Sequence, residues 1–441
     1  MKISQRKKEN LIQISLIIIT LIMIVLRFLL NEKGRVNPDS IRFFRTAKVF
    51  PVIDNTTTPL GYPLSLKFFT FFGIDEFWGS KIIGIFAYLF ILWFAKKKNF
   101  YFQETILVGG LFSYVSIFSY TMSESLILPF VFVFLYISKE IIIENIQKLK
   151  GVFYLSLFLI LLYNIRYSAL FFIGGSFLFG VLNFNKKYSK TFIISSIIGL
   201  AFIILYKFLF IDIFNEKYLD QFLEIGLHPT SQLLVELFQG LTTSFNPFVH
   251  IANPSGGIIN IGIYGIGLLN IIFIIFLFIK NTLSETERYL VFIGIIGILC
   301  SYFIQYFYSV NPLDYRLLSP FIFSIWLVEL KKIYQIFGKF TFGITILSLI
   351  TGLIFTWLSK GNYLENRKEM ENFLVSENLK TVPIKVYAPR NNLDKVQIAE
   401  LISTINPNVS LTSEPEDTLK SNVITEHKVL RKIKIDKNKY Q

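Results

Sequence analysis

The chain has 441 residues, of which 53% are hydrophobic and only 17% are charged, and its mean hydropathy is +0.54. A soluble protein of this length needs a more polar surface, so the composition predicts a protein buried in a bilayer. The net charge of +14 comes mostly from short basic clusters between apolar runs, which the positive-inside rule explains. We therefore expect membrane lipids as partners and no nucleic acid. The single cysteine, Cys300, excludes an intrachain disulfide.

Apolar runs long enough to cross a bilayer core of roughly 30 Å recur along the chain. They predict an all-α polytopic membrane protein with about eleven transmembrane helices. We place these helices at residues 11–30, 78–95, 104–120, 124–138, 152–165, 167–183, 191–211, 258–279, 289–308, 317–330 and 340–358. The first run is too long for a cleaved signal peptide, so we expect it to stay as a span.

The loop charges predict how these spans are oriented. With the N-terminus in the cytoplasm, most short basic loops fall on the inner side, as the positive-inside rule requires. The composition is rich in Ile, Phe, Lys and Asn, which is typical of an AT-rich bacterial genome. We therefore expect a multi-pass protein of the bacterial inner (plasma) membrane, with a cytoplasmic N-terminus and an extracytoplasmic C-terminal segment.

Two long outer segments interrupt the expected transmembrane domain of residues 1–358, at residues 31–77 and 212–257. The first is basic although it is expected outside. It is either an exception to the statistical rule or a surface that meets phosphates of headgroups or of a substrate. Its apolar stretch at residues 64–72 is too short to span and suits an interfacial helix. Residues 231–241, in the second segment, have an amphipathic pattern.

The composition changes at residue 359, where charged residues become frequent and no further spanning run occurs. Residues 381–388 alternate like a strand, residues 395–405 have a helical pattern, and residues 408–412 form another candidate strand. We interpret residues 359–441 as a small α/β extracytoplasmic domain.

Ionisable groups near membrane depth are costly and are therefore candidates for function. In the expected topology they fall on the outer side, namely Asp39, Asp54, Glu124, Arg166, His228, Glu236, His250, Asp314 and Arg316. Carboxylates and guanidinium groups together suit a phosphate-linked donor and a base acting on an acceptor hydroxyl.

Each candidate also has a structural alternative. Asp39 could be the N-cap of a helix, and Asp54 could be a turn residue. Glu124 could stabilise the N-terminus of a span, where a negative charge is favourable. Arg166 and Arg316 could extend to the lipid headgroups or form a structural ion pair with Asp314. The histidines could be structural or loop residues. No P-loop, zincin or serine-hydrolase motif is present in the sequence.

Four segments in order resemble the polyprenol-phosphate-sugar-dependent GT-C glycosyltransferases of the mannosyltransferase and aminoarabinose-transferase type. They are DSIRF at 39–43 with PLGYPL at 59–64, YTMSESL at 120–126, IRYSAL at 165–170 and DYRLLSP at 314–320. The likeness covers roughly residues 1–330. It departs from the family pattern where Ser40 stands in place of a second acidic residue, and where residues 59–63 replace a Pro-Pro pair.

The resemblance implies a GT-C-like fold and an inverting transfer of a sugar from a polyprenyl-phosphate donor to a glycan, lipid or protein acceptor. Asp39 would act as base with Glu124 in support, and Arg166 and Arg316 would neutralise the lipid phosphate. Lys67, Asp54, Tyr62, Asp314 and His250 complete the expected substrate-binding set. The resemblance leaves undecided whether the protein uses a divalent cation, Mg²⁺ or Mn²⁺, as a cofactor. The alternatives are a flippase or transporter of lipid-linked oligosaccharide and an O-antigen-type polymerase.

Overall fold

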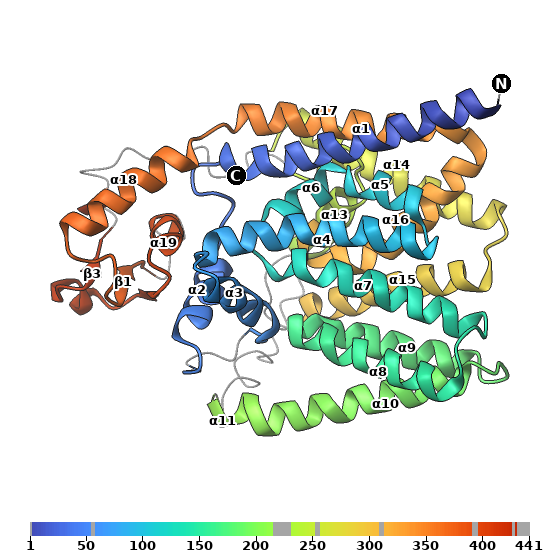
Figure 1. Cartoon of the computed structure of the whole chain (residues 1–441), viewed down its shortest axis with the longest axis horizontal. Coiled ribbons are helices and arrows are strands. Elements are labelled where there is room, and N and C mark those ends of the chain that lie inside the picture. The colour runs from blue at the N-terminus through green and yellow to red at the C-terminus, as the bar shows by residue number, and fades with distance from the viewer. Residues whose placement is uncertain are drawn as a thin grey trace. The chain divides into compact units, whose positions relative to one another are not determined.

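The computed structural model describes residues 2–53, 58–214, 231–251, 256–307, 313–389, 396–425 and 428–429, and it is predominantly helical (Figure 1). Among these residues, eight helical segments are long and apolar enough to cross a membrane. The expected class, a helical membrane protein, is therefore supported. Orientation, cell compartment and the exact number of crossings remain predictions.

The longer helices follow the apolar runs in chain order. They are α1 (Lys2–Leu29), α4 (Glu76–Lys98), α7 (Ser123–Ile142), α8 (Lys148–Ile165), α9 (Leu170–Leu182), α10 (Ser189–Tyr206), α14 (Ile258–Lys280), α15 (Glu285–Phe307), α16 (Tyr315–Phe337) and α17 (Phe342–Leu358). Shorter helices connect or flank them, namely α2 (Pro38–Val49), α3 (Gly61–Phe71), α5 (Phe102–Gly109), α6 (Phe112–Ser119), α11 (Asp212–Phe214), α13 (Ser231–Ser244), α18 (Tyr363–Ser376) and α19 (Val396–Ser403). Helix α3 includes all but the last residue of the apolar stretch at 64–72, for which the sequence predicts an interfacial helix, and α13 includes the amphipathic segment at 231–241.

The expected span at residues 104–120 is corrected, because it is divided into α5 and α6. At the break, the backbone N–H of Phe112 donates to the Ser348 hydroxyl at 2.8 Å instead of continuing the helix. A Cβ on Gly110 would lie 2.3 Å from the Thr345 methyl group, so the chain passes close to α17 at this point. Hydropathy alone does not detect such a break, since both halves are apolar.

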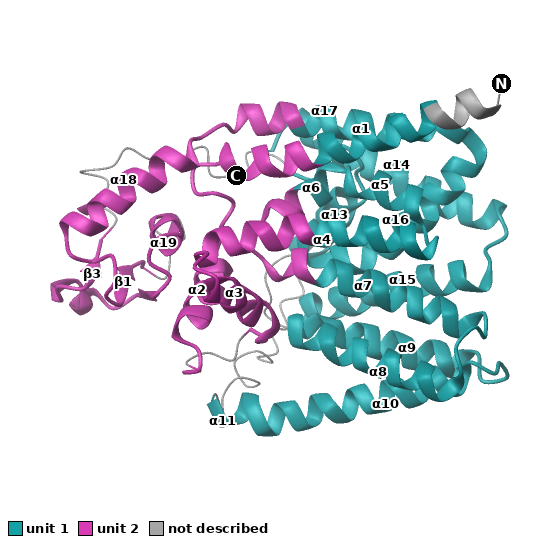
Figure 2. Ribbon diagram, viewed as in Figure 1, with its two compact units in different colours: residues 1–20, 87–115, 127–352 teal, residues 21–86, 116–126, 353–441 magenta. Residues whose placement is uncertain are grey.

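The chain forms two compact units (Figure 2). Unit 1 comprises residues 1–20, 87–115 and 127–352, and unit 2 comprises residues 21–86, 116–126 and 353–441. Within unit 1, α15 packs against α16 and α9, and α10 packs against α8 and α9. Trp326 and Tyr289 are fully buried there. Unit 1 is thus a helical bundle.

Unit 2 combines the first outer segment with the C-terminal segment. Strand β1 (Ile384–Tyr387) lies between β2 (Val409–Thr412) and β3 (Val423–Ile424) in a parallel sheet. Strands β1 and β2 and helix α19 fall inside the stretches that the sequence pattern marked. The short strand β3 was not expected.

The C-terminal segment and the first outer segment share one hydrophobic core. Helix α19 packs against α2, and the Tyr363 ring stacks on Phe77 with their centroids 4.4 Å apart. Phe44 and Leu401 belong to the same core and are fully buried. The domain boundary expected at residues 358–359 remains a prediction, but the tail buries its apolar side chains together with those of residues 28–83.

Gly84 allows α4 to approach the segment before α7 within unit 2. A Cβ at this position would lie 1.9 Å from the backbone oxygen of Phe118. We expect Gly84→Ala to lower the free energy of unfolding by about 1–3 kcal/mol, because the backbone must shift. Thermal unfolding in detergent measures this loss.

Gly174→Ala is the matched control, because nothing lies within 4 Å of a Cβ built at that position in α9. Alanine also favours the helix. An equal loss of stability in both variants would contradict the close approach at Gly84.

Candidate functional site

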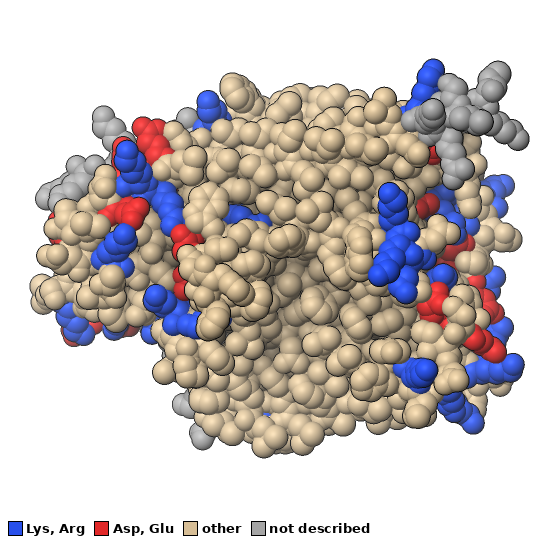
Figure 3. All heavy atoms as spheres, in the orientation of Figure 1, with Lys and Arg blue, Asp and Glu red and all other residues tan. Residues whose placement is uncertain are grey.

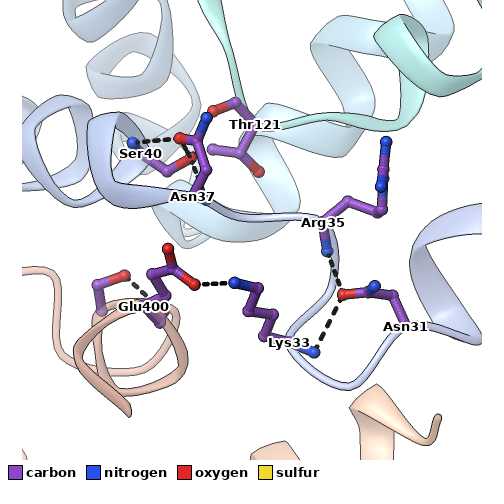
Figure 4. A network of polar contacts seen from close by, with 8 residues as sticks. Asn31, Lys33, Arg35, Asn37, Ser40, Thr121 and Glu400 are labelled. Atoms are coloured by element: carbon purple, nitrogen blue, oxygen red, sulfur yellow. Dashed lines mark hydrogen bonds and ion pairs between the residues drawn. The ribbon is translucent and has the colours of Figure 1, made fainter. Parts of the chain in front are cut away.

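The first outer segment begins with a turn that is stabilised by the side chain of Asn31. The Asn31 side-chain oxygen accepts hydrogen bonds from the backbone N–H groups of Lys33 and Arg35, at 3.1 and 3.0 Å (Figure 4). Gly34 and Arg35 both have positive φ angles, of 70° and 59°. A Cβ on Gly34 would lie 2.7 Å from the Phe77 ring, so only glycine fits this close approach. The turn therefore fixes where α2 begins.

Helix α2 carries Asp39 in its first turn, but Asn37 is the N-cap. The Asn37 side chain accepts from the Ser40 backbone N–H at 3.0 Å, and the Ser40 hydroxyl accepts from the Asn37 backbone N–H at 3.0 Å. This is a capping box. The interpretation of Asp39 as the N-cap is thus wrong. The Asp39 side chain is about half exposed (49%), 3.8 Å from the Arg42 guanidinium group.

Ser40 also joins α2 to the segment that leads to Glu124. Its hydroxyl donates to the Thr121 carbonyl oxygen at 2.7 Å, and the Thr121 N–H donates to the Arg35 carbonyl oxygen at 3.1 Å. The Arg35 guanidinium carbon lies 3.7 Å from the centroid of the Tyr120 ring. Two segments about 80 residues apart in the sequence are thereby held together, as Figure 4 shows for Ser40 and Thr121.

A buried polar cluster surrounds Thr121, formed by Tyr62, Ser80, Lys81, Thr121, Glu124 and Ser125. The Thr121 hydroxyl lies 2.7 Å from the Ser80 hydroxyl and 2.9 Å from the Lys81 Nζ atom. Lys81 also donates to the Ser119 carbonyl oxygen at 2.9 Å. Because Lys81 is only 2% exposed, its Nζ atom relies on these oxygens in place of water.

Glu124 contributes a carboxylate to this cluster, and its charge acts on the Tyr62 phenol. Glu124 lies in the first turn of α7 and is 1% exposed, and Tyr62 is fully buried in α3. Burial raises the pKa of Tyr62, the nearby negative charge of Glu124 raises it further, and the Ser80 and Ser125 hydroxyls oppose the rise. The phenol therefore stays protonated and is available as a hydrogen-bond donor.

A second charged contact lies beside α2, where Lys33 pairs with Glu400 of α19 (Figure 4). Both side chains are at most 10% exposed. Burial raises the pKa of Glu400, and the Lys33 ammonium group limits this rise, whereas the charge of Asp39 adds to it. Asp39 is therefore within electrostatic range of the C-terminal segment.

Unit 1 holds four of the residues expected to bind the substrate, and it brings three of them together. Asp314 caps α16 by accepting from the Arg316 and Leu317 N–H groups, and its carboxylate pairs with the Arg316 Nε atom at 2.7 Å. His250 is buried, with its ring centroid 4.0 Å from that of Tyr315. The expected structural pairing of Arg316 with Asp314 is thus present.

The other expected residues have separate places. Arg166 follows the end of α8 and donates from its Nε atom to the Ser168 hydroxyl at 2.8 Å. Lys67 is half-buried on α3, within electrostatic range of Glu76. Asp54 and His228 lie outside the described residues.

Sequence reasoning missed Ser40, Thr121, Lys81 and the Lys33–Glu400 pair. Lys81 had a usable signal, because a lysine inside an otherwise apolar run is costly and marks a special environment. Ser40 and Thr121 gave no such signal, since their importance comes from a contact between distant segments.

In the part of the chain that the structure describes, no group of three or more His, Cys, Asp or Glu side chains could hold a metal ion. A scan against protein-family models finds no family that matches the chain, and a search of curated proteins finds no match either.

Replacing Lys33 with methionine is expected to destabilise unit 2, because the buried Glu400 carboxylate then loses its cation. Removing one partner of a buried ion pair costs about 3–5 kcal/mol, whereas replacing both partners with apolar residues is often close to neutral. Chemical unfolding of Lys33→Met should show this loss, and the double variant Lys33→Met with Glu400→Met should recover most of it.

The loss should also depend on pH. The folded-state pKa of Glu400 is raised above its unfolded value, so its contribution is greatest below the unfolded pKa and declines as pH rises through the folded pKa. Without Lys33 that pKa rises further. We expect Lys33→Met to be less destabilising at a pH of about 5 than at about 8, and an equal loss at both pH values would show that Glu400 is not the cause.

Proposed function

We propose that the chain is a membrane glycosyltransferase that moves a sugar from a polyprenyl-phosphate donor to an acceptor at the outer face of the membrane. The observation that carries the proposal is the hydrogen bond from the Ser40 hydroxyl to the Thr121 carbonyl oxygen. It joins the helix with Asp39 to the segment with Glu124, which are the two acidic elements of the GT-C resemblance.

Asp39 has the exposure that a general base needs. Its carboxylate is half exposed, while Ser40, the next residue, is fully buried and fixed by hydrogen bonds. An acceptor hydroxyl can therefore reach the carboxylate, and the backbone that carries it is rigid. In the proposed reaction Asp39 takes the hydroxyl proton, the acceptor oxygen attacks the anomeric carbon, and the lipid phosphate leaves with the electrons of the broken bond.

Glu124 acts as a positioning residue in this proposal. It is buried, and its charge acts on Tyr62 within the cluster that contains Thr121. The cluster thereby stabilises the segment to which Ser40 is bound. The roles expected for Arg166 and Arg316 toward the lipid phosphate stay predictions, and Arg316 would have to share its guanidinium group between that phosphate and Asp314.

The test is Asp39→Asn in cells that lack the native gene. Loss of a general base lowers transfer by about 10²–10⁴-fold, and we expect the lipid-linked donor to accumulate. Mass spectrometry of envelope glycans and lipid-linked intermediates measures both, and protein levels in the membrane fraction must match the wild type.

Glu369→Gln is the matched control, because it neutralises another acidic side chain of unit 2 that is exposed on α18. It should restore the glycans fully. Full activity of Asp39→Asn would contradict the proposed base and favour a flippase. Deletion that leaves glycans unchanged and no donor accumulated would overturn the transferase proposal itself.

A further inference from the structure

Unit 1 contains a polar cavity beside the loop that joins α4 to α5. Its volume is about 630 Å³, which lies within the range of about 300–1,000 Å³ of small-molecule sites. The walls include the side chains of Gln103, Ser284 and Thr286, which can hydrogen bond to a ligand, and the amines of Lys139 and Lys331. Basic side chains, with acidic side chains among them, gather at one end of unit 1 on the face shown in Figure 3.

Each of three consecutive aromatic residues at this loop makes a cation–π contact with a lysine. The Lys139 Nζ atom lies 5.8 Å from the Phe100 ring centroid, and the Lys331 Nζ atom lies 5.1 Å from that of Tyr101. The Lys96 Nζ atom lies 6.0 Å from that of Phe102. Cation–π contacts of this kind restrict where the amines point without removing their hydrogen-bonding capacity. The lysines are therefore arranged around the cavity and its margin.

The backbone at Tyr101 supports a site here. Tyr101 has φ 49° and ψ 37°, a left-handed conformation that bulky residues rarely adopt. Asn99 also has a positive φ of 47°, which the end of α4 explains, since asparagine commonly ends helices in this way. No comparable reason applies to Tyr101, and strain of this kind is concentrated at functional sites.

An apolar groove between α1 and α4 lies next to the cavity. The groove has a volume of about 420 Å³ and shares Gln13 and Phe102 with the cavity. Ile14, Ile17 and Leu89 contribute to its walls, together with Leu92 and Trp93. A polar cavity next to an apolar groove fits an amphiphile, with its headgroup in the cavity and its chain in the groove.

Charge selects the kind of headgroup. The cavity and the groove are lined by three lysines, Lys96, Lys139 and Lys331, and by one glutamate, Glu104. Lys139 pairs with Glu140 at 3.0 Å. Lys331 pairs with Glu287 at 2.8 Å, and Glu287 is shared with a second lysine, Lys332, at 3.0 Å. The four lysines Lys96, Lys139, Lys331 and Lys332 therefore outnumber the three carboxylates Glu104, Glu140 and Glu287 by one, and this excess positive charge favours a negative ligand.

We infer that this site binds one anionic glycerophospholipid, with its phosphate headgroup in the cavity at the lysines and an acyl chain in the groove between α1 and α4. The basic loops around it are those that the positive-inside rule assigns to the cytoplasmic leaflet. The inference does not depend on the proposed sugar transfer, and its test needs no enzyme activity.

The experiment places the full chain in nanodiscs made of equal amounts of phosphatidylglycerol and phosphatidylcholine. After mild detergent extraction, native mass spectrometry counts the lipids that stay bound. The wild type should retain phosphatidylglycerol selectively. Lys96→Gln and Lys139→Gln should each lower this preference about fivefold, the usual effect of one lysine near an anionic lipid. Ile17→Trp should reduce retention of both lipids, because the indole fills the groove.

Two control variants match these changes. Lys190→Gln removes an exposed lysine of α10 that lies outside the lining, and Ile18→Trp adds the same bulk one residue further along α1, at a 51% exposed position. Both should behave as the wild type. If Ile17→Trp also lowers the thermal stability, its lipid retention is not interpreted. The test then depends on Lys96→Gln, which changes an exposed side chain. Unselective retention, an unchanged preference in both lysine variants, or displacement of the lipid by soluble glycerol phosphate at equal concentration would each overturn the inference.

Discussion

The hydrogen bond between the Ser40 hydroxyl and the Thr121 carbonyl oxygen fixes α2 against the segment before α7 in unit 2. It is fully buried, so water cannot replace it when either partner is lost. Thr121 in turn contacts Ser80 and Lys81, so a change at Ser40 would reach α4 as well. The half-exposed Asp39 is therefore carried by a backbone that is fixed on its buried side.

Composition and hydropathy were sufficient to predict most of the long helices, because burial of about twenty apolar residues in a row has few alternatives. They failed at Gly110 and Leu111, where a side-chain hydroxyl of α17 replaces the helical hydrogen bond partner of Phe112. The strands β1 and β2 were visible as alternating patterns. Strand β3 has only two residues and is set by pairing with β1, which no local pattern reveals.

The candidate site was predictable only in part, and the reason is physical. Asp39 and Glu124 are ionisable groups beside apolar runs, so their cost made them conspicuous. Ser40 and Thr121 are common residues whose hydroxyl groups matter because of a contact between segments far apart in the sequence. The role of Asn37 as N-cap was missed for a different reason, since Asp39 also has a side chain suited to capping, and the choice depends on where the preceding turn ends.

The structure shows what most of the basic residues do in the segment that the expected topology places outside, against the positive-inside rule. Of its five basic residues before Asp54, three are engaged within unit 2: Lys33 pairs with Glu400, Arg35 stacks on Tyr120, and Arg45 donates to Asn408 at 2.8 Å. Arg42 and Lys48 are exposed. The cations that break the rule thus serve mainly to hold the C-terminal segment and the Glu124 segment against α2. If this segment binds phosphates, which is one of the two alternatives that its sequence leaves open, only Arg42 and Lys48 are exposed to do so. Arg42 already lies beside Asp39. If the outer loop binds the phosphate of a donor, it therefore does so next to the proposed base.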